Sequence, residues 1–258
     1  MRSIPVLMYH HILPQSGFIT VTTTNFKDQM QMLKSNGWYT LSAEEFLNFK
    51  LGKFTPPEKS LLITFDDGWL DNYTYAYPVL KELGFRATVF IVTSWIENAP
   101  HSKELAYSTH KEAGILAKEG RSGAVFSKEL LHECKDVFDF HSHLHTHTNR
   151  FKESVDFTQE LQKSQEFFKK EFGKFSEHLC HPWGHYKKDD EEAITKEGFT
   201  LAYTVENGSN TQSDNPLYIK RFNVKDRGAN WLKHKLFLYS NPSLARFYGW
   251  FKKMKNKL

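Results

Sequence analysis

The stretch "LLITFDDGW", residues 61–69, decides the fold prediction. Its first five residues are apolar or β-branched, which predicts a strand that is buried on both faces. Asp66 and Asp67 follow directly, and Gly68 permits a tight exit from the strand. In parallel α/β folds the carboxyl ends of the strands form the functional face. The stretch therefore predicts two carboxylates at that face, although a bare Asp-Asp-Gly is also common as a helix-capping turn.

Apolar runs of strand length recur along the 258 residues and alternate with amphipathic stretches of helical length. This alternation predicts a mainly parallel sheet, either open or closed into a barrel, with residues 95–126 as a polar helical insertion. The absence of internal repeats and of long linkers in the sequence favours one domain. The expected strands are 4–9, 60–65, 86–92, 136–140, 177–181, 199–205 and 217–224, and the expected helices are 22–38, 69–84, 157–171 and 189–196.

A run of alternating histidines, "HSHLHTH" at residues 141–147, follows the apolar segment "DVFDF". Imidazole is the commonest protein ligand of transition metals, so the run indicates a metal site. An extended run would place all four rings on one face, whereas a helical run would bring together only His141 with His145 or His143 with His147. Either pair, joined by one Asp, would give the three-ligand arrangement of catalytic zinc sites. An adventitious surface cluster is the alternative.

The charge distribution is asymmetric. Residues 227–258 carry eight basic side chains and no acidic one, so residues 1–226 carry 26 basic against 30 acidic side chains. This balance excludes a polyanion-binding body, and we expect no nucleic-acid partner. Two cysteines are too few for a disulfide framework. The sequence has no recognisable secretory leader and no apolar run near the roughly 20 residues of a membrane span, so we expect a soluble, cytoplasmic protein.

"ITFDDGWLDNY" (63–73), together with the downstream "SHLHTH" (142–147), resembles the polysaccharide deacetylases of the NodB-homology type, carbohydrate esterase family 4. The resemblance covers about residues 4–225, and "PVLMYH" (5–10) is similar to the opening strand of the poly-N-acetylglucosamine deacetylase branch. It implies an α/β fold, a distorted (β/α)7-type barrel forming a single domain at 1–226, followed by a basic amphipathic segment at 227–258. It also implies one divalent metal, which in this family is usually Zn²⁺.

The resemblance also assigns roles. Asp67 and two histidines would hold the metal, and Asp66 would be the general base. The family's second motif favours His143 and His147 as the pair, with His141 and His145 as the alternative register. His10, at the end of the first strand, matches the general acid of this branch, with His11 as the fallback, because His234 does not make a convincing late L-x-H motif.

The segment "LCHPWGHY" (179–186) resembles the third motif, R-x-P-x-G. Its Pro182, Trp183 and Gly184 match and would line the sugar site, with Trp183 as a wall. Cys180 stands where the family usually has the Arg that orients the base. Two further residues are expected at the substrate: Trp69, directly after the first motif, and Arg221, which matches a recurrent Arg of the branch.

The implied activity is removal of the N-acetyl group from an N-acetylhexosamine. In the tail "NPSLARFYGWFKKMKNKL" (241–258), apolar residues recur at helical spacing among Lys and Arg, which indicates a helix lying on an anionic membrane, with a helix packed on the barrel or a solvated tail as alternatives. Together, the expected cytoplasmic location and this tail favour a substrate carried on a polyprenyl-phosphate lipid or glycolipid at the inner face of a bacterial inner membrane. Such an enzyme resembles the deacetylases of lipid-linked galactosamine, which implies a role in lipid A and envelope modification. The alternatives are a deacetylase of poly-N-acetylglucosamine-type polysaccharide and an inactive carbohydrate-binding barrel.

Overall fold

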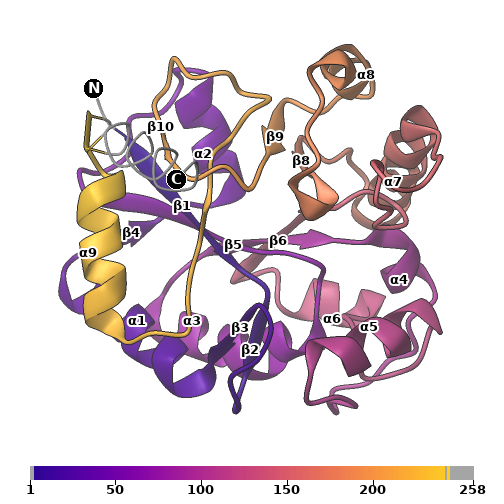
Figure 1. The fold of residues 1–258 in the computed structure, drawn as a ribbon, viewed down its shortest axis with the longest axis horizontal. Helices are drawn as coiled ribbons and strands as arrows, with labels where there is room; N and C mark the ends of the chain where they lie inside the picture. Colours follow the sequence, from indigo (N-terminus) through magenta and orange to yellow (C-terminus); the bar gives the residue numbers. More distant parts are fainter. Residues whose placement is uncertain (1–2, 242, 245–258) are drawn as a thin grey trace, which may run out of the picture.

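The computed structural model describes residues 3–241 and 243–244 of the chain. At its centre lies a curled sheet in which seven strands run parallel in the order β11-β1-β5-β6-β7-β8-β9 (Figure 1). An isolated parallel bridge between Tyr203 and Ile219 joins the last strand of this order to the segment before β11. The strands are β1 (Ile4–Tyr9), β2 (His11–Leu13), β3 (Thr20–Thr22), β4 (Tyr39–Thr40), β5 (Ser60–Phe65), β6 (Ala87–Ile91), β7 (Phe138–Ser142), β8 (His178–Cys180), β9 (Leu201–Tyr203), β10 (Ser209–Asn210) and β11 (Phe222–Asn223).

Helices cover the outside of this sheet, and the α/β barrel predicted from the sequence is confirmed (Figure 1). Residues 69–84 form a π-helical turn at Asn72–Ala76 and then an α-helix, which ends at Gly84 as predicted. The α-helices are α1 (Thr23–Ser35), α2 (Ala43–Lys50), α3 (Tyr77–Leu83), α4 (Thr93–Glu97), α5 (His110–Lys118), α6 (Lys128–Glu133), α7 (Phe157–Phe172), α8 (Glu191–Lys196) and α9 (Ala229–Tyr239).

The strand expected at 136–140 lies two residues later, as β7. Val137 still belongs to the turn after α6, because its N–H donates to the carbonyl of Cys134 at 3.0 Å. At the other end, His141 and Ser142 pair with β6, opposite Phe90 and Ile91. The end of this strand, and with it the start of the histidine loop, is therefore set by its partner strand and not by the local apolar run.

The two faces of the sheet have different environments. Alternate residues of β5, including Ile63 and Phe65, pack outward against α1 and α3 in the largest apolar cluster. The residues between them point into the barrel, where Leu62 joins a smaller apolar cluster. Thr64 follows on the same face and is fully buried. The barrel interior thus becomes polar towards the carboxyl ends of its strands.

Residues 95–126 contain α5 and long connecting loops. Two backbone hydrogen bonds tie the end of this segment to the exit of β5: Leu70 N–H donates to Ala124, and Phe126 N–H donates to Gly68. Gly68 has a φ of +78°, and a Cβ there would lie 2.9 Å from a methyl of Ile91. The insertion therefore binds the residues that follow the two carboxylates, and glycine is required at position 68 because the backbone there has a positive φ and packs against Ile91 of β6.

The helix α9 begins inside the segment that the sequence places after the barrel domain. It packs against α1, its Leu232 and Leu236 are buried, and Tyr239 stacks on Phe222 of β11 with ring centroids 4.7 Å apart. The proposed membrane helix at 241–258 lies almost wholly outside the described residues. Within the described part of the chain, no helix has the length and apolar character needed to cross a membrane.

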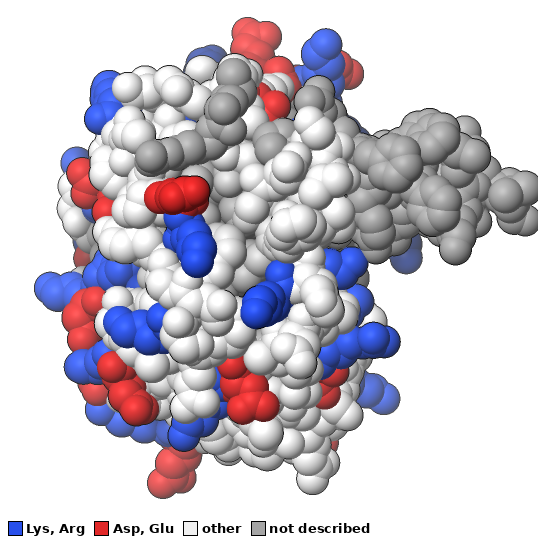
Figure 2. Space-filling model, turned by 90° about the vertical axis from the view of Figure 1, so that its left-hand side faces the viewer, with Lys and Arg blue, Asp and Glu red and all other residues white. Residues whose placement is uncertain are grey.

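Figure 2 shows the side of the molecule at the left of Figure 1, where Lys and Arg side chains are interspersed with Asp and Glu. This mixture agrees with the nearly balanced charge of residues 1–226. The absence of a nucleic-acid partner stays a prediction.

One carboxylate fastens the segment after β11 to the start of α1. Asp226 accepts hydrogen bonds from Thr22 N–H, Thr22 Oγ1 and Asn25 Nδ2 at 2.9, 2.8 and 2.6 Å. Partial burial raises the pKa of Asp226, but these hydrogen bonds more than offset it, so the pKa lies below the ordinary 3.8. The stabilising contribution is therefore present above that value and fades as the pH falls through the lowered pKa.

We predict that Asp226→Ala lowers the free energy of unfolding by about 1 to 2 kcal/mol at pH 7, because charge-assisted hydrogen bonds are lost. The difference from the wild type should shrink below about pH 4. Urea unfolding at both pH values measures it, with Asp28→Ala on the exposed face of α1 as the control. A difference that is equal at both pH values would contradict the electrostatic origin.

Candidate active site

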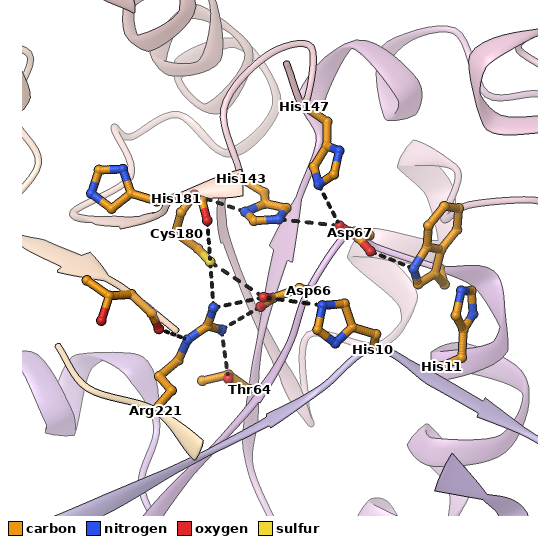
Figure 3. A network of polar contacts seen from close by, with 12 residues as sticks. His10, His11, Thr64, Asp66, Asp67, His143, His147, Cys180, His181 and Arg221 are labelled. Carbon is orange, nitrogen blue, oxygen red and sulfur yellow. Dashed lines mark hydrogen bonds and ion pairs between the residues drawn. The ribbon is translucent and has the colours of Figure 1, made fainter. Parts of the chain in front are cut away.

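Polar side chains gather at the ends of four of five neighbouring parallel strands (Figure 3). His10 follows β1, Asp66 and Asp67 follow β5, His143 follows β7, and Cys180 is the last residue of β8. The sheet order β1-β5-β6-β7-β8 brings these ends together, although they are far apart in the sequence. The predicted functional edge therefore exists, and its chemistry depends on how these side chains meet.

Asp67, His143 and His147 form a compact group of potential metal ligands. The Nε2 atoms of His143 and His147 lie 3.3 and 3.1 Å from the same oxygen, Oδ1 of Asp67. Ligands about 2.0 to 2.1 Å from a tetrahedral ion are separated by about 3.3 Å, so the spacing fits a divalent metal. Two imidazoles and one carboxylate also match the donor set of catalytic zinc sites, which leave one position open.

Neighbouring groups fix the orientation of these ligands. The carbonyl of Cys180 lies 2.9 Å from Nδ1 of His143, so Nδ1 carries the proton and Nε2 is free for a metal. Trp69 Nε1 donates to Oδ2 of Asp67 at 2.9 Å and leaves Oδ1 facing the two histidines. Burial raises the pKa of Asp67, but the charge and hydrogen bonds of His147 and His143 lower it well below the ordinary 3.8. Asp67 is therefore a carboxylate at neutral pH.

The histidine run is neither extended nor helical beyond Ser142. Leu144 and His147 adopt left-handed backbone conformations, with φ of +63° and +56°. These two turns bring His143 and His147 to the same side and send the other two histidines elsewhere. His141 Nδ1 lies 2.9 Å from Ser176 Oγ, and His145 Nδ1 lies 3.0 Å from Thr93 Oγ1. The structure therefore brings together His143 and His147, the pair that the resemblance favours. The backbone between them is neither an extended strand nor a helix.

Asp66 lies beside this group and is paired with Arg221. Nη1 and Nη2 of Arg221 donate to the two oxygens of Asp66 at 2.6 and 2.8 Å, and both side chains are almost completely buried. Burial raises the pKa of Asp66, but the charge and hydrogen bonds of Arg221 more than offset it, so the pKa is lowered. Asp66 is therefore an oriented anion, with its charge balanced.

Cys180, at the position of the family's third-motif Arg, lies between these two partners. Arg221 Nη2 donates to its sulfur at 3.1 Å, and its thiol donates to Asp66 Oδ2 at 3.7 Å. Burial raises the pKa of the Cys180 thiol, so the sulfur stays protonated at neutral pH. The guanidinium missing from the third motif is thus supplied by the segment before β11.

His10 faces the other side of Asp66, with Nε2 3.8 Å from Oδ2 (Figure 3). Its Nδ1 is buried and has no hydrogen-bond partner among the described residues. Protonation would bury an unsatisfied N–H there, and burial lowers the pKa of His10 against the opposite influence of Asp66 and Asp67. His11, the fallback acid, is fully buried and bound to Asp71 at 2.6 Å, so it does not face Asp66.

The residues expected at the substrate fall into two groups. Trp183 is 56% exposed and donates through Nε1 to the carbonyl of His147 at 3.4 Å, beside buried Pro182. Gly184 has a φ of +70°, and a Cβ there would lie 2.3 Å from a methyl of Val205, which explains the glycine. Trp69 and Arg221 are 1% and 0% exposed and cannot offer a surface to a sugar. Their expected contact with substrate is corrected: they hold Asp67 and Asp66 instead.

Sequence reasoning missed Trp95, which lies at the start of the insertion. Its ring lies against both Trp69 and His147, with centroids 5.4 and 5.3 Å apart. It therefore helps to hold the indole that binds Asp67 and one of the candidate ligands. No motif marks it, and its only signal was the richness of the chain in aromatic residues.

The family model described as polysaccharide deacetylase matches residues 53–202, more than half of the chain. The chain belongs to the polysaccharide deacetylase family. This is a family of hydrolases that act on amide bonds, and metal dependence is typical of it. The matched range contains the carboxylates, the histidine run and the third motif.

Two known proteins are similar over most of the chain. The Bacillus subtilis (strain 168) protein YxkH, which is named after the same family, is 28% identical over 86% of this chain and 71% of its own. A poly-beta-1,6-N-acetyl-D-glucosamine N-deacetylase from Staphylococcus aureus (strain MRSA252) is 28% identical over 80% of this chain and 68% of its own.

Solved structures show the same fold. Streptococcus pyogenes deacetylase PplD superposes with a TM-score of 0.77 at 23% identity, covering 91% of this chain and 98% of PplD. IcaB from Ammonifex degensii superposes with a TM-score of 0.74 at 21% identity, covering 92% of this chain and 97% of IcaB. At these identities the structural similarity supports the fold, so the predicted α/β barrel is confirmed. The predicted family is confirmed by the family model.

We predict that Trp69→Phe lowers the zinc affinity about tenfold, because the hydrogen bond that orients Asp67 is lost while most of the ring remains. Competition with a chromogenic chelator measures the affinity. Trp95→Phe is the matched control, since it changes a neighbouring indole that donates no hydrogen bond to Asp67. Equal affinities in the two variants would show that the hydrogen bond does not matter.

Proposed function

We propose that this family member is a metal-dependent N-deacetylase of a polysaccharide built from N-acetylhexosamine, of the poly-N-acetylglucosamine type. The observation that carries the proposal is the group of Asp67, His143 and His147 beside the paired carboxylate Asp66. The similarity to a poly-beta-1,6-N-acetyl-D-glucosamine N-deacetylase over four fifths of the chain supports the polymer as substrate.

The two other readings have less support. The lipid-linked substrate was inferred from the tail at 241–258, which lies almost wholly outside the described residues, and the relatives above favour the polymer. The inactive barrel was inferred from the missing third-motif Arg. Because Arg221 binds Asp66 with both of its terminal nitrogens, that argument loses its basis.

In the proposed site, Asp67, His143 and His147 hold one divalent metal, and their donor atoms are those that zinc prefers. When bound, the metal polarises the amide carbonyl and makes the attacking water more acidic. Cys180 and Trp69 contribute by fixing the ligand orientation, through a backbone carbonyl and an indole N–H.

Asp66 is the proposed general base, held by Arg221 on the side away from His10. It accepts the proton of the water as the new C–O bond forms. His10, on the other side, donates a proton to the sugar nitrogen as the C–N bond breaks. The products are acetate and a free amino sugar. Trp183, exposed next to His147, is proposed as a wall of the sugar site.

We predict that Asp66→Asn keeps its zinc but lowers acetate release from β-1,6-linked N-acetylglucosamine oligomers about a thousandfold, because the base is removed. Metal analysis and an acetate assay measure the two properties. Asp139→Asn, which breaks another Asp–Arg pair where β7 begins, is the matched control and should keep full activity. An active Asp66→Asn variant would refute the assignment of the base.

The pH profile tests His10. Because its pKa is lowered, its acid form is lost as the pH rises through a value below 6.5. We therefore expect kcat/KM to decline as the pH rises above that value. His10→Gln should lower kcat at least about 100-fold and remove this alkaline decline. The control is His234→Gln, on the exposed face of α9. An unchanged profile in His10→Gln would assign the acid to another group.

A further inference from the structure

A row of neighbouring aromatic rings includes His147, one of the candidate metal ligands. Successive ring centroids along it lie between 5.3 and 5.8 Å apart. The middle of the row, at Trp69 and Trp95, is buried and supports the ligands. Both ends reach the surface, since Phe18 is 70% and Trp183 is 56% exposed. In order, the row consists of Phe18, His110, Trp69, Trp95, His147 and Trp183.

Near the Phe18 end of the row, the hydrogen bonds of Asp71 determine which nitrogen of His11 carries the proton. Asp71 is fully buried, and Oδ1 accepts from Ile12 N–H at 2.8 Å and from Asn72 Nδ2 at 2.7 Å. Its Oδ2 accepts from Tyr107 Oη at 2.7 Å and faces His11 Nδ1 at 2.6 Å. A carboxylate has only acceptor sites, so His11 Nδ1 carries the proton.

The same reasoning assigns the donor and acceptor nitrogens of His110. In neutral His11, Nε2 is then an acceptor, and its contact of 3.0 Å with Nδ1 of His110 requires that Nδ1 carry the proton. The hydrogen bond between the two rings uses Nδ1 of His110, which leaves the second nitrogen, Nε2, as an acceptor.

The position of Phe18 is also fixed. It lies in the loop between β2 and β3, where Ile19 has a φ of +47° and its carbonyl accepts from His11 N–H at 3.3 Å. The carbonyl of Phe18 itself accepts from Thr20 Oγ1 at 3.1 Å. The exposed phenyl ring lies 5.3 Å from the ring of His110, measured between centroids. An apolar ring next to an acceptor nitrogen suits a hexose, which has an apolar ring face and hydroxyl donors.

We propose that Phe18 and His110 form a second sugar subsite, separated from Trp183 along this row by Trp69, Trp95 and the candidate ligand His147, and that the enzyme therefore binds internal residues of an N-acetylhexosamine oligosaccharide. The inference rests on the proposed function and adds to it that sugars are bound on both sides of the reacting residue. Phe18 stacks on a pyranose face, and His110 Nε2 accepts from a sugar hydroxyl.

The test uses the metal-loaded full chain and β-1,6-linked N-acetylglucosamine oligomers of two and six residues. Phe18→Ala and His110→Phe should each weaken binding of the hexamer about threefold to tenfold, measured by calorimetry, with a smaller loss for the dimer. In acetate release, KM for the hexamer should rise by a similar factor while kcat changes little, because the contact is equal in ground and transition states.

Two further variants sharpen the test. His110→Gln should recover most of the affinity lost in His110→Phe, because the amide oxygen can take the place of Nε2. Phe175→Ala, which removes a ring 55% exposed elsewhere on the surface, should change nothing. Losses that are equal for dimer and hexamer, or a fall in kcat alone, would overturn the subsite and assign these residues to support of the metal centre.

The two proposals can fail separately. Length-dependent binding that is lost in the variants, without acetate release by the wild type, would refute the deacetylase function and support the subsite. Acetate release by the wild type with unchanged hexamer binding in Phe18→Ala and His110→Phe would support the function and overturn the subsite.

Discussion

The buried ion pair between Asp66 and Arg221 constrains the rest of the structure. A carboxylate inside a barrel must be compensated, because an unpaired buried charge is very costly. Arg221 compensates it with two hydrogen bonds, and its Nε donates to the carbonyl of Thr204 at 2.9 Å. These contacts draw the segment around Arg221 across the space between β9 and β1, where Tyr203 bridges Ile219. Closure of the sheet and orientation of the proposed base thus depend on one side chain.

Some of this could be predicted from the sequence, because the signals are local. An apolar run followed by two carboxylates predicts a strand end, and parallel strands bring their carboxyl ends to one edge, so Asp66, Asp67 and the histidine run were expected together. The choice of His143 and His147 needed the family resemblance. Periodicity alone could not make it, since the loop turns at Leu144 and His147, and positive φ is uncommon outside glycine.

The rest could not be predicted because it depends on contacts between distant residues. Trp69 was expected at the substrate because it follows the first motif, and Arg221 because it matches a recurrent Arg of the family branch. Both are buried, and Arg221 meets a carboxylate that lies 155 residues away in the chain. Cys180 likewise stood where the family usually has an Arg, whereas the guanidinium of Arg221 reaches the same carboxylate from the segment before β11. A motif in the sequence therefore does not determine which residue places a guanidinium beside the carboxylate in the folded protein.

Backbone strain marks the same region independently of any motif. Among the described residues, positive φ at non-glycine positions occurs at Ile19, Asp67, Leu144, His147 and Trp183. Asp67 and His147 are candidate metal ligands, and Leu144 lies between His143 and His147. The other two belong to the opposite ends of the aromatic row, at Trp183 and next to Phe18. Such conformations cost about 1 to 3 kcal/mol each and persist only where surrounding contacts enforce them. The strained backbone conformations thus occur beside both surface ends of the row as well as at the metal centre, and surrounding contacts must enforce them at all of these places.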